Sequence, residues 1–426
     1  MADHIHPFRI ANFRAYWASR LSMTLAQYAM IIIIGWQTYN IARETMSPPE
    51  AAARLGMIGL LQFIPLFVLT PVVGWVADRL DRRNIGRATV SLQTLCAATL
   101  AFFTWHGAMT LPILFTVAVL LGVARAFSGP AFSALAPNLV PKEVLPHAIA
   151  LSSISWQVGM IIGPSIGGYA YAISPAAAYI ASTVLFAAAL VAVSLIGPVP
   201  RTFAPSRAHP LRQIAEGLAY VWQNKLVLGA ITLDLFAVLL AGATALFPVY
   251  ARDILHVGSR GLSMLAAAPA AGAAATAIVF SFRPLKSNVG PKMLVAVFVF
   301  GCSQIVFGLS HWLPLSLGAL FVSGCADMFS VYIRQSLIQL HTPDDKRGRV
   351  SAVSQLTISA SNELGEAESG FLASLFSAPF AVVAGGLGAI TVTLLWTWLF
   401  PSIRNARTFD PPETLHDPST RLETVS

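Results

Sequence analysis

The hydrophobic positions of this chain fall into about twelve long runs separated by short polar turns. The run from Leu55 to Ala77 contains no Asp, Glu, Lys or Arg. At about 1.5 Å per residue in a helix, such a run can cross a hydrocarbon core of roughly 30 Å. Further charge-free runs extend from Ala88 to Ala124 and from Val144 to Pro200, each divided by a turn-like segment. Because the runs are continuously apolar rather than alternating, they predict membrane-spanning helices and not a β-barrel.

The pattern predicts an all-α polytopic membrane protein with twelve transmembrane helices in two six-helix bundles. We expect the spans near 15–42, 53–77, 86–105, 111–136, 144–172, 176–197, 226–250, 260–282, 292–310, 313–340, 349–376 and 379–401. Composition agrees, because 56% of the residues are hydrophobic and only 11% are charged, with a mean hydropathy of +0.68. Soluble globular proteins carry about one-quarter charged residues.

Basic residues indicate how the chain is oriented. Only four arginines, Arg43, Arg54, Arg252 and Arg260, lie in the loops on one side of the membrane, whereas most of the other Lys and Arg residues lie on the side of the two termini. Basic residues are enriched in cytoplasmic loops, so both termini are predicted to be cytoplasmic. The net charge of +8 is then a matter of topology and requires no nucleic-acid partner.

An internal repeat divides the chain into two similar halves. A shift of 202 residues aligns identical residues in the fourth and fifth spans with residues in the tenth and eleventh, among them Gly122 with Gly324, Ser128 with Ser330, Gly163 with Gly365 and Gly168 with Gly370. Duplicated six-span units are typical of one large class of transporters. We therefore expect an N-terminal bundle at 1–198, a cytoplasmic linker with an amphipathic helix at 199–225, a C-terminal bundle at 226–403 and a disordered cytoplasmic tail at 404–426.

A highly charged loop follows the second span. The stretch "GWVADRLDRR" places Gly74, Asp78, Arg79, Arg82 and Arg83 at the spacing G-x-x-x-D-R-x-x-R-R. It resembles the loop signature of the major facilitator superfamily, with Asp81 where that signature has a glycine. The resemblance implies that the loop is a clasp at the cytoplasmic mouth of a transporter, which opens when the two halves rock. The alternative is that the charges only anchor the topology.

Two further motifs resemble the same superfamily. Arg125 and Gly129 in the fourth span fit its R-x-x-x-G pattern, whose arginine is associated with proton coupling. The fifth span contains Gly159, Gly163, Pro164, Gly167 and Gly168 in the string "GMIIGPSIGG", which matches the antiporter signature that marks exporters. Glycines four residues apart allow close helix packing. The segments at 332–356 and 361–376 resemble the enterobactin-exporter-like and drug–proton antiporter branch, and Asp344 and Arg347 there are expected either to gate or to anchor a second cytoplasmic loop.

Ionisable residues inside the spans are the candidates for transport chemistry, because they are costly at membrane depth. They are Arg20, Arg125, Asp234, Asp327, Arg334, Glu363, Glu366 and Glu368. Asp327 and Arg334 are two helical turns apart, so they are expected to pair or to line one cavity, unless each only belongs to a structural network. Glu363, Glu366 and Asp234 are the preferred proton carriers. A pocket for an amphipathic molecule could be lined by Gln27, Trp36, Gln37, Trp156, Gln157, Phe236, Tyr332 and Gln335, for which packing or lipid contact is the alternative role.

These observations predict a secondary active transporter in a bacterial cytoplasmic membrane that exports a siderophore-like or drug-like compound in exchange for protons. An importer or uniporter of the same fold and a non-transporting membrane sensor remain alternatives. An enzyme is disfavoured, because the aqueous loops are short and carry no catalytic motif. We expect no cofactor and no metal, with the proton gradient as the energy source. The expected partners are protons, a small molecule and the lipid bilayer, and the expected state is a monomer.

Overall fold

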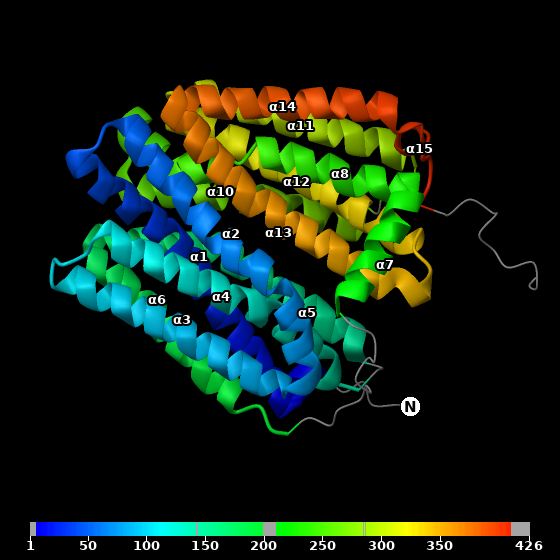
Figure 1. Ribbon diagram of the computed structural model, residues 1–426, viewed down its shortest axis with the longest axis horizontal. Coiled ribbons are helices and arrows are strands. Elements are labelled where there is room, and N and C mark those ends of the chain that lie inside the picture. Colours follow the sequence, from blue (N-terminus) through cyan, green and yellow to red (C-terminus); the bar gives the residue numbers. More distant parts are fainter. Residues whose placement is uncertain (1–5, 142–143, 199–209, 284, 286, 410–426) are drawn as a thin grey trace, which may run out of the picture.

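The fold is entirely helical in the part of the chain that the computed structural model describes. That part comprises residues 6–141, 144–198, 210–283, 285 and 287–409, without the side chains at 71, 74, 75, 77, 78, 134, 210–214, 344 and 345. Figure 1 shows two groups of long helices lying side by side, the first built from the N-terminal half of the chain and the second from the C-terminal half. The expected tail beyond residue 409 and the first part of the linker, 199–209, lie outside the described residues.

Six long helices form the N-terminal half. They are α1 (Ala11–Thr45), α2 (Pro48–Arg79), α3 (Arg82–Trp105), α4 (Leu111–Leu135), α5 (Leu145–Ile173) and α6 (Pro175–Ser194), with short 3-10 turns at Pro7–Arg9 and Ala136–Asn138. Asp81 and Ser174 cap two of them, each accepting a hydrogen bond from the first turn, and Ser47 at the start of α2 donates to Glu50 in a capping box. Prolines in the first turn of α2, α4, α5 and α6 suit helix starts, because the missing N–H has no partner there.

The C-terminal half follows an amphipathic linker helix, α7 (Pro210–Gln223). Its long helices are α8 (Lys225–Leu240), α10 (Gly258–Phe282), α11 (Val289–Leu309), α12 (Leu313–Leu340), α13 (Asp344–Leu375) and α14 (Ala378–Leu399), with the short α15 (Pro401–Arg404) at the end. The structure thus places helices at all twelve predicted spans, and most boundaries differ from the expectation by only a few residues.

The seventh span is the exception, because it is not one continuous helix. The chain leaves α8 at Leu240 and continues through η4 (Ala243–Leu246), α9 (Phe247–Val249) and the π-helix η5 (Tyr250–Ile254). The break occurs where Gly242 lies against the backbone of Gly365 in α13, so closely that a Cβ at Gly242 would lie 2.3 Å from the Gly365 carbonyl oxygen. Irregular helix geometry of this kind is frequent at functional sites.

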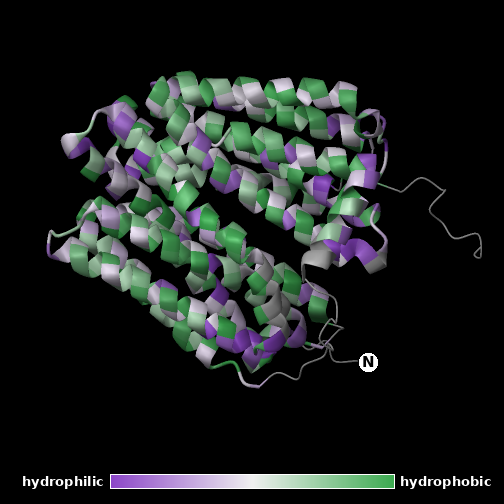
Figure 2. Cartoon of the chain, viewed as in Figure 1, coloured by the Kyte–Doolittle hydropathy of each residue, from purple (hydrophilic) through white to green (hydrophobic). Residues whose placement is uncertain are grey.

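One long helix is more polar than the others. Eleven helical segments of the described chain are long and apolar enough to cross a membrane, and α13 is not among them. Its 32 residues carry three glutamates in the second half and a charged first turn. Nevertheless α13 packs along α2, α8 and α14 in the middle of the molecule. Figure 2 shows the hydrophilic positions mainly at the two ends of the bundle, with a smaller number inside it.

Two helix pairs form the interface between the halves. α2 packs on α13 and α5 packs on α10. At the first crossing Gly56 meets Gly370, and at the second Gly168 lies against Ser259 and Ser263, so that a Cβ at Gly168 would lie 2.5 Å from the Ser259 carbonyl oxygen. Gly168 and Gly370 are partners in the 202-residue repeat. The repeat therefore places a glycine at the equivalent inter-half crossing in each half.

The two halves are joined most firmly at the end that carries the α1–α2 turn, here called the turn end. A buried hydrophobic cluster there contains Trp36 and Leu55 of the first half together with Phe247 and Phe307 of the second. The other clusters of described buried residues each lie within one half. Figure 1 shows the two groups of helices diverging toward the opposite end, where α7 lies. We call that opposite end the linker end.

Polar contacts reinforce the turn end. The Tyr39 hydroxyl donates to Asp253 Oδ2 at 2.5 Å, and Arg43 Nε donates to the same oxygen at 3.2 Å. Arg252 Nη1 donates to Asn40 Oδ1 at 2.5 Å. Each of these bonds connects α1 with the π-helix η5, so each crosses between the halves.

At the linker end, α7 contacts both α13 and α2. Its contact with the second half is specific. Arg349 Nη1 pairs with Glu216 at 3.0 Å, and the Tyr220 hydroxyl donates to the His341 carbonyl at 2.7 Å. α7 is therefore bound by specific contacts to the C-terminal half, and it also contacts α2 of the N-terminal half.

Candidate functional site

An arginine at the middle of α4 connects the two halves through a carboxylate. Arg125 Nη1 lies 2.7 Å from Glu363 Oε1 in α13, and the Glu363 side chain is only 7% exposed. The same nitrogen donates to Gln62 Oε1 in α2 at 2.9 Å. Glu366 follows one turn later, with its Cβ packed against the position of Gly59. Because a charge buried at this depth requires a partner, Arg125 and Glu363 form an ion pair that crosses between the halves.

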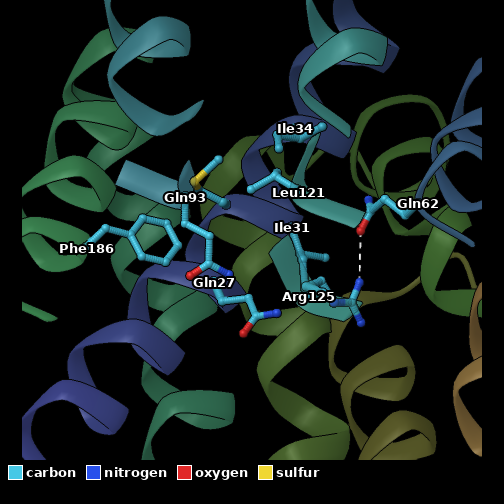
Figure 3. Close-up of a pocket in the computed structure, with 9 residues that line it drawn as sticks. Gln27, Ile31, Ile34, Gln62, Gln93, Leu121, Arg125 and Phe186 are labelled. Carbon is cyan, nitrogen blue, oxygen red and sulfur yellow. Dashed lines mark hydrogen bonds between the residues drawn. The ribbon is translucent and has the colours of Figure 1, made fainter. Parts of the chain in front are cut away.

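The N-terminal half contains a small, partly open hollow beside this ion pair. It is lined by Gln27, Met30, Ile31, Ile34, Gln62, Gln93, Leu121, Arg125 and Phe186. In Figure 3, Phe186 and Arg125 lie at opposite sides with the Gln27 and Gln93 amides between them. The walls are otherwise apolar, so the hollow combines apolar surface with three amides and one arginine.

A second charged centre lies inside the C-terminal half. Arg334 in α12 forms an ion pair with Asp234 in α8, and the two residues are 3% and 9% exposed. Asp234 also lines a small hollow with Asp327 and Ser330. Asp327 has no hydrogen-bond or ion-pair partner among the residues that the structure describes. Arg334 thus pairs with Asp234 on another helix, rather than with Asp327 on its own helix as the seven-residue spacing suggested.

The two hollows occupy repeat-related places. Arg125 lines the first and Asp327 the second, and these positions are exactly one repeat apart in the sequence, at the equivalent points of α4 and α12. They do not face one shared cavity; each lies in the hollow of its own half. Arg125 is paired with Glu363, whereas Asp327 has no partner among the described residues.

The glycine string of α5 packs mainly against α1. Gly159 lies against Thr24, Gly163 against Leu25 and Tyr28, and Gly167 against Ala29, at distances that leave no space for a Cβ. Pro164 is buried within the same helix. Small residues at this spacing let two helix backbones approach closely. Only Gly168, the last of the string, contacts the other half of the molecule.

Arg20 lies on the same α1–α5 contact. Its guanidinium carbon is 5.8 Å from the ring centre of Trp156, and Trp156 in turn makes an edge contact with Tyr28. The Arg20 Nε atom is buried without a hydrogen-bond partner. Arg20 therefore lies apart from the Arg125 and Arg334 centres, against an aromatic pair.

Arg83 and Arg87, after the α2–α3 turn, bind within their own half. Asp81 caps α3 and forms a 2.6 Å ion pair with Arg83. Arg83 and Arg87 also donate to the carbonyls of Ile196 and Ser194 at the C-terminal end of α6, where cations are favoured. Asp81 in place of glycine therefore serves as a helix cap.

The remaining loop candidates are only partly described. The side chains at Gly74, Asp78 and Asp344, which are central to the predicted clasp, lie outside the described part of the structure, although their backbone belongs to α2 and α13. Arg79 and Arg82 lie at the α2–α3 turn. Arg347 donates to the Gln339 carbonyl at 3.3 Å.

The predicted pocket residues do not form one lining. Gln27 lines the N-terminal hollow. Trp36 is buried in the cluster at the turn end, and Gln37 donates to Thr104 there. Phe236 packs on Trp396, and Tyr332 packs on Phe280. Among the described residues, no group of three or more His, Cys, Asp and Glu side chains is arranged to hold a metal ion.

Comparison with known proteins identifies the family. The Major Facilitator Superfamily model matches residues 15–366. The chain belongs to the Major Facilitator Superfamily. As a member of this superfamily it is a multi-pass secondary transporter of small molecules and not an enzyme. The superfamily fold also accounts for the two groups of six long helices.

Individual relatives of this superfamily member cover nearly its whole length. Macrolide efflux protein A of Streptococcus pyogenes is 26% identical, over 94% of this chain and 97% of its own. Enterobactin exporter EntS of Escherichia coli is 24% identical, over 92% and 94%. Among solved structures, a POT family transporter has a TM-score of 0.71 at 14% identity over 92% and 96%, and a D-xylose-proton symporter has 0.66 at 14% over 91% and 97%.

Three functional candidates in this superfamily member were missed in the sequence. Gln62 and Gln93 are amides inside charge-free spans, and they would have been found by listing every costly polar side chain rather than only ionisable ones. Asp253 was overlooked because the seventh span was expected to end at residue 250, which placed it in a loop. All three are defined by contacts between helices that are distant in the sequence.

Proposed function

We propose that this transporter exports an amphipathic organic compound across the bacterial cytoplasmic membrane in exchange for protons. The observation that carries the proposal is the ion pair between Arg125 and Glu363, which joins the halves near the middle of their helices. Protonation of Glu363 removes its charge and therefore its attraction for Arg125. A proton that reaches this carboxylate then weakens a contact that must change when the halves move.

Other groups complete the proposed coupling centre. Gln62 keeps one hydrogen bond to Arg125 when Glu363 is neutral. Glu366 lies one turn further along α13, so that a proton can be passed between two carboxylates on the same helix face. Arg20, Asp234, Asp327 and Arg334 are proposed as further coupling or substrate residues.

Export is supported by the glycine string of α5 and by the printed names of the relatives, which describe efflux of macrolides and export of enterobactin. Import or uniport by the same fold is the alternative. A membrane sensor that does not transport is a second alternative, and it would tolerate neutralisation of the buried charges.

The orientation is proposed from the basic residues, which place both termini and α7 in the cytoplasm. The linker end, where the two groups of helices diverge (Figure 1), is then the cytoplasmic end. Residues 1–198 and 226–403 are proposed as the moving units, with 199–225 as their linker. Gly74–Arg83 and Asp344–Arg347 are proposed as clasps that meet when the cytoplasmic end closes. We propose a monomer without a cofactor.

The experiment uses everted membrane vesicles in which an imposed pH gradient is followed with a fluorescent dye. A macrolide or enterobactin, added to vesicles that contain the transporter, is expected to dissipate part of the gradient and to accumulate inside. Glu363→Gln is expected to abolish both effects. Glu368→Gln is the matched control, because Glu368 contacts Ser369 rather than Arg125.

Two results would contradict the proposal. Accumulation that is unchanged when the pH gradient is collapsed would indicate uniport. Full proton-coupled accumulation by Glu363→Gln would show that the ion pair with Arg125 is not part of the coupling.

A further inference from the structure

The hollow in the N-terminal half contains an amide that its surroundings do not satisfy. Gln93 is only 1% exposed, and its Oε1 atom is buried without a hydrogen-bond partner. Buried polar atoms in folded proteins are nearly always paired, so an unpaired one that lines a hollow indicates a group that binds there. Gln27 lines the same space, and Figure 3 shows its amide next to that of Gln93.

The charge in the hollow is already balanced. Arg125 is its one charged lining residue, and this arginine is held by Glu363 and by Gln62. An anionic ligand would have to displace Glu363, and a cationic ligand would meet Arg125 without a free carboxylate. The remaining walls are formed by aliphatic side chains and by the ring of Phe186. The hollow therefore favours an uncharged group.

The two glutamine amides further restrict which chemical groups the hollow can bind. A glutamine amide offers both a hydrogen-bond acceptor and two donors. A hydroxyl group also donates and accepts, whereas an ammonium group only donates and a carboxylate only accepts. Gln27 and Gln93 together thus match neighbouring hydroxyls on an apolar frame. Because the hollow is small, it accommodates one edge of a larger molecule.

We propose that this hollow is a subsite for an uncharged, hydroxyl-bearing edge of the transported compound, such as the face of a sugar ring, with Gln93 and Gln27 as its specificity residues. The inference deepens the proposed function and rests on it for the direction of transport. The hollow of the C-terminal half, with two aspartates, has no comparable set of amides.

The test measures equilibrium binding to the full-length transporter in lipid nanodiscs by ligand-observed saturation-transfer NMR, without any pH gradient. The probes share one alkyl chain and differ in the head: hexyl β-D-glucoside, hexyltrimethylammonium and hexanoate. Empty nanodiscs correct for partitioning into lipid. The wild type is expected to saturate the sugar-ring protons of the glucoside most strongly.

Gln93→Leu is expected to weaken glucoside binding about 5- to 10-fold. This is the size of the effect when an amide hydrogen bond is lost and its partner is left unpaired. Binding of hexyltrimethylammonium is expected to stay unchanged. The matched control is Gln304→Leu, because Gln304 on α11 also has a buried, unpartnered Oε1 but does not line the hollow. Gln27→Leu, at a less buried position, provides a second variant if Gln93→Leu fails to fold.

Equal glucoside binding by the wild type, Gln93→Leu and Gln27→Leu would overturn the proposal and indicate a hollow that holds water only. Gln93-dependent binding of hexyltrimethylammonium or hexanoate in place of the glucoside would overturn the assigned chemistry. Because no gradient is applied, a failure of proton antiport leaves this result intact. Proton-coupled transport together with Gln93-independent binding would reject the subsite alone.

Discussion

Each half of this transporter contains an arginine in a buried ion pair, but the two arginines take their carboxylates from different halves. Arg125 of the N-terminal half forms its ion pair across the interface, with Glu363 of the other half. Arg334 of the C-terminal half forms its ion pair within the same half, with Asp234. The rocking of the halves proposed above would therefore disturb the first pair, whereas the second pair would move as a unit. The first pair crosses the interface between the halves, and the second does not.

The largest effect is expected for Arg125→Gln. The change leaves Glu363 buried without its partner, and breaking a buried ion pair costs about 3–5 kcal/mol. Thermal unfolding in detergent should detect the loss, and proton-coupled accumulation in everted vesicles should fall below detection. The double variant Arg125→Gln with Glu363→Gln should recover most of the stability without recovering coupling. If the single variant still couples, the interface pair is not the responsive centre.

Arg334→Met is expected to destabilise the protein by a similar amount, about 3–5 kcal/mol, because Asp234 is left unpaired. It should not shift the balance between inward-open and outward-open forms, since α8 and α12 belong to one half. Spin labels at Ala108→Cys and His311→Cys, on exposed turns of different halves, would report that balance by their distance distribution. The measurement requires a background without Cys96, Cys302 and Cys325. A shift of the spin-label distance distribution in Arg334→Met would show that the Arg334–Asp234 pair also responds to the conformation of the two halves.

A smaller shift is expected for Asp253→Asn at the turn end. The change weakens two bonds to α1, from Tyr39 and Arg43, and it favours the form that is open at the turn end. Because the Arg43 and Asp253 side chains are about one-quarter exposed, the effect should be about 1 kcal/mol, roughly a fivefold change in population. The same pair of spin labels measures it. Glu44→Gln, an exposed carboxylate on the same helix, should leave the distances unchanged.

The smallest effect on stability is expected for Asp327→Asn. Unlike Asp234, this carboxylate holds no described partner that the substitution would leave unpaired, so thermal unfolding should change by no more than about 0.5 kcal/mol. Unfolding of Asp234→Asn, measured side by side, provides the contrast. A loss for Asp327→Asn as large as that for Asp234→Asn would mean that Asp327 belongs to the internal ion pair after all.

The helices could be predicted from the sequence because their length is fixed by the membrane. The break after Leu240 could not, since it depends on Gly242 meeting Gly365, more than a hundred residues later. The partners of the buried charges were equally inaccessible. Spacing on one helix suggested that Arg334 meets Asp327, but the choice of Asp234 is made by the packing of α8 on α12. The pairing of Arg125 with Glu363 likewise depends on how the halves meet.

The linker helix has a consequence for the surrounding lipid. α7 is fastened to the C-terminal half by Glu216 and Tyr220, and its Leu218 and Trp222 side chains are 52% and 70% exposed. When that half tilts as proposed, these side chains move within the headgroup layer of the membrane, and Lys225, which lies beside Trp222, moves with them. We expect the viscosity and the charge of this leaflet to slow the transport cycle. The turnover rate in reconstituted vesicles should therefore change with the fraction of anionic lipid.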